Sequence, residues 1–135
     1  MAYDVATLVS EMLREHGMEN IIEDDLSNHS TISLSMKEDI PTINIKTEDN
    51  TVWVWAKITD NTPVSFDYCS NNLVPLMLEN QEDYFIAGQP CLYITDEGIE
   101  LRAIIEDKNM QSADVFQDML GQFLDILQNY RTVLL

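Results

Sequence analysis

The first half of the chain changes from one spacing of apolar residues to another. In residues 5–13, Val5, Leu8, Val9, Met12 and Leu13 recur every three or four positions, which predicts one face of a helix. In residues 31–36, 42–46 and 51–58 every second residue is apolar, which predicts three strands. The polar run at 48–50 predicts a hairpin turn between the second and third strands.

The strongest strand pattern lies in residues 51–58, where both faces are largely apolar. Val52 and Val54 share one face with Ala56, whereas Trp53 and Trp55 share the other. A strand that is apolar on both faces is typically covered on both sides. We therefore expect a second cover over the two tryptophans.

The patterns in the second half of the chain predict a helix, then several strands, and then a second helix. Residues 65–80 have a helical pattern that Pro75 interrupts, and a proline inside a helix costs about 3 kcal/mol. The sequence leaves open whether this helix begins near Asn72 or bends at the proline. Short strands are expected at 84–86, 91–94 and 99–105, and a long amphipathic helix capped by Ser112 is expected at 112–134.

The order of these elements is α-β-β-β-α-β-β-α. Runs of strands joined by short turns favour an antiparallel sheet. The sequence therefore predicts an α+β fold in which three helices flank a twisted antiparallel sheet, within a single domain spanning residues 1–135.

Charge and composition narrow the function. The net charge is −17, yet 45% of the residues are hydrophobic, so the chain can bury a core. Such an acidic surface repels phosphate backbones and anionic lipids, which argues against nucleic-acid and membrane partners. We expect no signal peptide and no membrane span, and two reduced, inert thiols, Cys69 and Cys91, in a cytoplasmic protein.

Sequence patterns for catalysis are missing. The four glycines are too far apart for a phosphate-binding loop or a nucleophile elbow. His16 and His29 lack the spacing of metal ligands, and they are more simply surface and turn residues. We therefore expect no enzymatic activity, no cofactor and no metal.

The positive signal is a surplus of apolar side chains, including seven methionines. Most of them belong to the core. Taken together, they indicate a homodimer, a protein that binds an extended partner, or both. Two other classes stay open, namely an acidic nucleic-acid mimic that inhibits a DNA- or RNA-binding protein, and a small enzyme with an unrecognised site.

One stretch of the sequence resembles a known family. His29-Ser30-Thr31-Ile32 leads into the first strand, Pro41 precedes Ile43 and Ile45, and the third strand contains Val52-Trp53-Val54-Trp55-Ala56. This succession is similar to the InvB/SpaK-type chaperones of bacterial type III secretion. Pro75 departs from the uninterrupted second helix of that pattern.

The resemblance implies a homodimeric, cytoplasmic, ATP-independent bacterial chaperone. Such a chaperone binds the N-terminal segments of secreted effectors in extended form, keeps them secretion-competent and delivers them to the secretion apparatus, whose ATPase is a further candidate partner. From the pattern and the resemblance, the predicted effector-binding residues are Leu8, Met12, Ile32, Leu34, Ile43, Ile45 and Trp55. The predicted dimer-interface residues are Leu73, Leu76, Met77, Leu92 and Ile94.

Overall fold

The computed structural model describes residues 5–15, 31–34, 40–59, 66–79, 84–86, 89–96 and 98–134, with the backbone alone for 66–70. His16, His29 and the side chain of Cys69 lie outside this part, and so do the ends of several predicted elements. The elements are α1 (Val5–Glu15), β1 (Ile32–Leu34), β2 (Ile43–Glu48), β3 (Thr51–Thr59), α2 (Phe66–Met77), β4 (Cys91–Thr95), β5 (Gly98–Ile104), the short 3-10 helix η2 (Asp107–Met110) and α3 (Ala113–Leu134).

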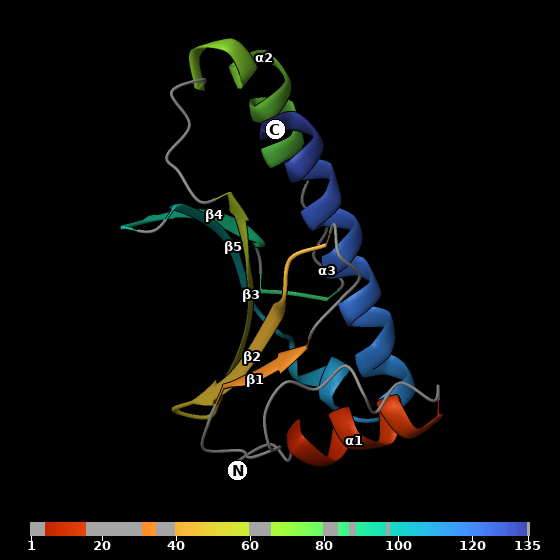
Figure 1. Ribbon diagram of the computed structural model, residues 1–135. Coiled ribbons are helices and arrows are strands. Elements are labelled where there is room, and N and C mark those ends of the chain that lie inside the picture. Colours follow the sequence, from red (N-terminus) through yellow and green to blue (C-terminus); the bar gives the residue numbers. More distant parts are fainter. Residues whose placement is uncertain are drawn as a thin grey trace.

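The strands form one antiparallel five-stranded sheet in the order β1-β2-β3-β5-β4. Figure 1 shows the sheet as a twisted layer, with α1 and α3 along one of its sides. The predicted α+β class and element order are therefore confirmed. The expected strand at 84–86 is wrong, because the only ladder contact of this described segment is an isolated bridge between Phe85 and Ile105.

Alternation along the strands determines which face is buried. In β3, Val52, Val54, Ala56 and Ile58 are buried, whereas the intervening residues are half-buried. The buried face packs against α1 and α3, and the largest enclosed side chains of the core include Phe85, Phe116, Phe123 and Tyr130. We call the buried side of the sheet the inner face and the opposite side the outer face.

The turn between β2 and β3 follows from its two central residues. Asp49 and Asn50 have φ angles of 51° and 64°. Positive φ at both central positions matches a type I′ turn, whose twist suits a two-residue hairpin, and Asn and Asp tolerate this conformation best after glycine. The predicted turn at 48–50 is thereby confirmed.

The second helix passes through its proline. α2 runs from Phe66 to Met77 and includes Pro75, so the alternative in which it begins near Asn72 is wrong. Pro75 lies near the C-terminal end of α2 and offers no N–H to the carbonyl of Asn71. Both residues are exposed. The helix then closes with hydrogen bonds from the Leu78 N–H to the carbonyls of Val74 and Pro75, at 3.2 and 3.1 Å.

The long helix α3 begins directly after Ser112, the residue predicted to cap it. The backbone N–H of Val115 donates to the Ser112 hydroxyl at 3.3 Å, and Asp114 lies in the first turn, where a carboxylate favours the helix dipole. The eight buried residues of α3 recur at helical spacing along one face. This helix therefore contributes the main apolar stripe that covers the sheet.

Candidate functional site: two uncovered surfaces

A group of large apolar side chains remains exposed on α2 and β4. Leu78 is 80% exposed and Ile94 is 64% exposed, with Val74 at 51% and Met77 at 44%. We call these four residues the α2–β4 surface. Val74, Met77 and Leu78 are neighbours by helical spacing, and exposed apolar side chains that lie together mark a site of interaction.

Tyr130 interacts electrostatically with one group of β4 and with one group just after α2. Tyr130, near the C-terminal end of α3, is 1% exposed. Burial raises the pKa of its phenol, and the thiol of Cys91 in β4 and the carboxylate of Glu79 after α2 raise it further. Both β4 and the end of α2 are thus within electrostatic reach of Tyr130, and Figure 1 shows α2 beside the C-terminal part of α3.

The structure divides the predicted dimer residues into two groups. Met77 and Ile94 are exposed, as a dimer surface requires. Leu76 and Leu92 are half-buried against the core, and Leu73 is buried. Leu73 faces inward because it lies on the side of α2 that packs toward α3.

Sequence reasoning missed two members of this surface. Val74, Met77 and Leu78 are spaced at i, i+3 and i+4, which is a helical stripe in its own right. Leu73 belongs to a different apolar stripe of the same helix, and it was also predicted to lie in the dimer interface. In the structure Leu73 is buried in the core of the protomer. The presence of two apolar stripes on this helix is the sequence signal that could have distinguished core residues from interface residues.

The outer face of the sheet is the second uncovered surface. Strand register places Trp55 between Asn44 and Arg102, and Trp53 between Lys46 and Ile104. Both tryptophans are half-buried, and the helices α1 and α3 lie on the opposite side of the sheet. Within the described part of the chain, the expected cover over the tryptophans is therefore missing.

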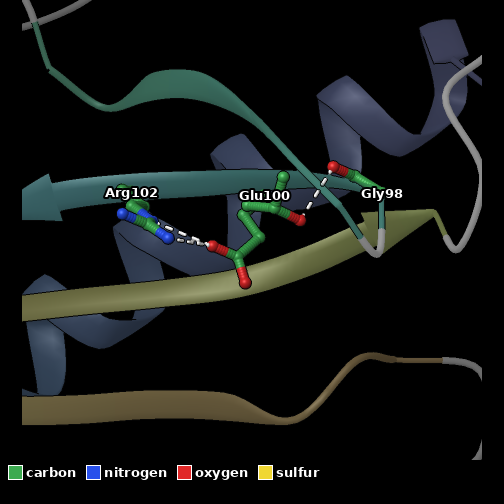
Figure 2. Close-up of polar contacts among 4 residues, drawn as sticks. Gly98, Glu100 and Arg102 are labelled. Carbon is green, nitrogen blue, oxygen red and sulfur yellow. Dashed lines mark hydrogen bonds and ion pairs between the residues drawn. The ribbon is translucent and has the colours of Figure 1, made fainter.

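Arg102 is held in position by two neighbours on this face. Its Nη2 and Nε donate to Oε1 of Glu100 at 2.6 and 2.9 Å, as Figure 2 shows. Its guanidinium carbon lies 4.9 Å from the centre of the Tyr93 ring, within the range of a cation–π contact. These contacts hold the guanidinium in one orientation beside Trp55. The Arg102 side chain would therefore lose little further conformational entropy if a ligand bound there.

The outer face is hollowed beside the tryptophans, with a volume of about 600 Å³. Its lining includes Trp53, Trp55 and Ile104, together with the basic side chains of Lys46 and Arg102. At the turn end the hollow also meets Glu48 and Asp49. We call this open depression the tryptophan hollow.

Most of the predicted effector-binding residues lie elsewhere. The structure places Met12, Ile32, Leu34, Ile43 and Ile45 in the core, each no more than 4% exposed. They lie on the inner face or on the side of α1 that packs against it, and the protein's own helices cover them. A partner could reach them only if those helices moved away.

The other two predicted effector-binding residues keep accessible surface. Leu8 is half-buried against the core, and Trp55 lies in the tryptophan hollow. Their role in effector binding stays a prediction, and Trp55 is the predicted residue that leads to the uncovered outer face.

Within the described segments, no three His, Cys, Asp or Glu side chains are close enough to hold a metal ion. The thiol of Cys91, in β4, is half-buried. In the same segments no helix is both long and apolar enough to cross a bilayer.

Comparison with known proteins fits this arrangement. The model of the invasion protein B family matches residues 17–96, more than half of the chain. The chain belongs to the invasion protein B family. Two relatives, the surface presentation of antigens protein SpaK of Salmonella typhimurium strain LT2 and that of Salmonella typhi, are each 25% identical over 126 residues, which cover 93% of this chain and 91% of theirs. The resemblance to the InvB/SpaK-type chaperone family is thus confirmed.

Proposed function

We propose that the protein is a cytoplasmic chaperone of bacterial type III secretion that binds the N-terminal segments of effectors in extended form. Membership of the invasion protein B family supports this proposal most directly. In this role the protein keeps effectors stable and secretion-competent and hands them to the secretion apparatus. It acts by binding alone, without a cofactor or a reaction of its own.

The proposal includes a homodimer formed through the α2–β4 surface. Val74, Met77 and Leu78 at the end of α2 would pack against the same region of a second copy, together with Ile94 of β4. In a two-fold dimer the same patch is used by both partners, so an exposed apolar side chain on one protomer meets the same patch on the other. Burial of these side chains would remove the largest apolar exposure among the described residues.

An acidic surface suits this role. A protein that keeps apolar surfaces open for partners needs another way to stay dispersed, and a net charge of −17 supplies mutual repulsion between copies. The same charge disfavours nucleic acid as the partner. Effector recognition would then rest on apolar contacts and on main-chain pairing with an edge strand of the sheet, such as β1.

Co-expression with secreted proteins encoded near its gene tests the proposal. We expect a stable complex of two chaperone chains and one effector, in which limited proteolysis spares an N-terminal effector segment. A wild-type protein that forms no such complex with any secreted protein of its source would contradict the proposal. Binding to a DNA- or RNA-binding protein that collapses above physiological salt would instead favour the acidic mimic.

A further inference from the structure

Met77 differs from the other described methionines in its exposure. It is the last residue of α2, and 44% of its surface is exposed. The other methionines of the described chain are buried, each no more than 7% exposed, namely Met12, Met110 and Met119. Oxidation of a thioether requires contact between its sulfur and the dissolved oxidant. Among the described methionines, Met77 is therefore the one that an oxidant reaches in the folded protomer.

The surroundings of Met77 are apolar. Val74 precedes it by three residues and Leu78 follows it directly, and both of these side chains are more than half exposed. Neither they nor Ile94 of β4 can donate a hydrogen bond from the side chain. The helix itself, residues 66–77, contains no lysine or arginine. A polar oxygen added to Met77 would thus have no donor among the side chains of the α2–β4 surface.

We propose that Met77 is a modification site, at which oxidation of the thioether to the sulfoxide dissociates the dimer formed through the α2–β4 surface. With hydrogen peroxide as the oxidant, the Sδ lone pair attacks one peroxide oxygen, the O–O bond breaks, an S–O bond forms and water leaves. The sulfur loses two electrons and the peroxide gains them. Methionine sulfoxide reductases reverse this reaction. The inference rests on the proposed function, because it concerns the regulation of the proposed dimer.

The sulfoxide favours the separate protomers for a physical reason. In a protomer the new oxygen faces water, which supplies its hydrogen bonds. In the dimer the same oxygen would be buried against apolar side chains, and a buried acceptor without a donor is destabilising. Each dimer contains two copies of Met77, so we expect its dissociation constant to rise at least tenfold when both are oxidised.

The same linkage determines when the reaction occurs. Dimer formation would cover the sulfur, so peroxide reacts with the fraction of the protein that is dissociated. Oxidation of Met77 should therefore slow as the protein concentration rises above the dissociation constant of the dimer. A methionine that is exposed but outside the interface would show no such dependence on concentration.

The experiment treats the full-length protein with hydrogen peroxide and measures the sulfoxide content of each methionine by peptide mass spectrometry. Dithiothreitol then reduces oxidised cysteines, whereas methionine sulfoxide remains. Sedimentation equilibrium gives the dissociation constant before and after treatment. We expect Met77 to be oxidised well before Met119, the dissociation constant to rise at least tenfold, and methionine sulfoxide reductases to restore it.

Met77→Leu is the matched control, because leucine has a similar volume and no sulfur. This variant should form the dimer as the wild type does and keep its dissociation constant after peroxide treatment. Met12→Leu replaces a buried methionine and should stay as sensitive to peroxide as the wild type. Circular dichroism melting curves check that both variants are folded.

Three results would overturn the inference. One is oxidation of Met77 that is no faster than that of Met119. Another is complete oxidation of Met77 with an unchanged dissociation constant, and the third is an equal response of Met77→Leu to peroxide. An untreated wild type that is monomeric at high concentration would reject the proposed dimer and the inference together. A stable untreated dimer that ignores oxidation of Met77 would reject the inference alone.

Discussion

Replacing Ile94 by alanine should dissociate the proposed dimer without unfolding the protomer. Ile94 lies on β4 and is 64% exposed in the protomer, so its side chain contributes little to the core. The substitution removes three carbon atoms, and each buried methylene contributes roughly 0.8 kcal/mol. Scaled by the exposed fraction, the loss is about 1.5 kcal/mol per protomer.

Two-fold symmetry doubles this loss. Each dimer contains two copies of Ile94, so the association free energy falls by about 3 kcal/mol and the dissociation constant rises about a hundredfold. Sedimentation equilibrium over a concentration series measures this change directly. Thermal melts of the dilute, monomeric variant should coincide with those of the dilute wild type.

Ile86→Ala is the matched control. Ile86 is an isoleucine that is 40% exposed, and it lies beside Ile104, near the end of β5 opposite to Ile94. We expect its substitution to leave the dimer unchanged. Equal dissociation constants for the two variants, or a wild type that stays monomeric at high concentration, would refute the assignment of the α2–β4 surface.

Three further predictions concern stability. Phe123→Ala should lower the free energy of unfolding by about 3–5 kcal/mol in urea titrations, because Phe123 is fully buried and its ring meets that of Phe85 edge-on at 6.1 Å; a loss below about 1 kcal/mol would show that this position is not in the core. Ser112→Ala should cost about 1 kcal/mol by removing the cap of α3, while Ser112→Asp should keep the stability, and an equal loss in both would contradict the cap. Burial raises the pKa of Tyr130, so its phenol binds its proton more tightly in the folded state. The contribution of this group to the free energy of unfolding is therefore complete below the ordinary tyrosine pKa near 10, and it falls as the pH rises above that value. Thermal melts of Tyr130→Phe at alkaline pH should show a smaller loss of stability than those of the wild type.

Alternation predicted the strands well, because one face of each strand is buried. The pattern at 51–58 fixed the inward residues of β3, and a one-residue slip of register would have moved all of them to the outer face. The turn at Asp49 and Asn50 followed from residues that tolerate positive φ. Local chemistry therefore determined these features.

The division between core and binding surface could not be predicted in the same way. A side chain such as Ile45 or Ile32 is apolar whether the protein's own helices or a partner covers it. The pattern identifies a face that needs a cover, and tertiary packing decides which cover it receives. For the same reason, Trp53 and Trp55 were expected under a second layer, although the described chain leaves them at the surface.

Dimerisation through the α2–β4 surface should strengthen as salt is added. Association of two copies brings together chains of net charge −17, so the apolar contacts of the α2–β4 surface form against repulsion. Added salt screens that repulsion over about 8 Å at physiological ionic strength, and dimerisation should strengthen. Sedimentation equilibrium across a salt series measures this trend, and a dimer that weakens as salt is added would show that attraction between charges, rather than apolar contact, holds the two copies together.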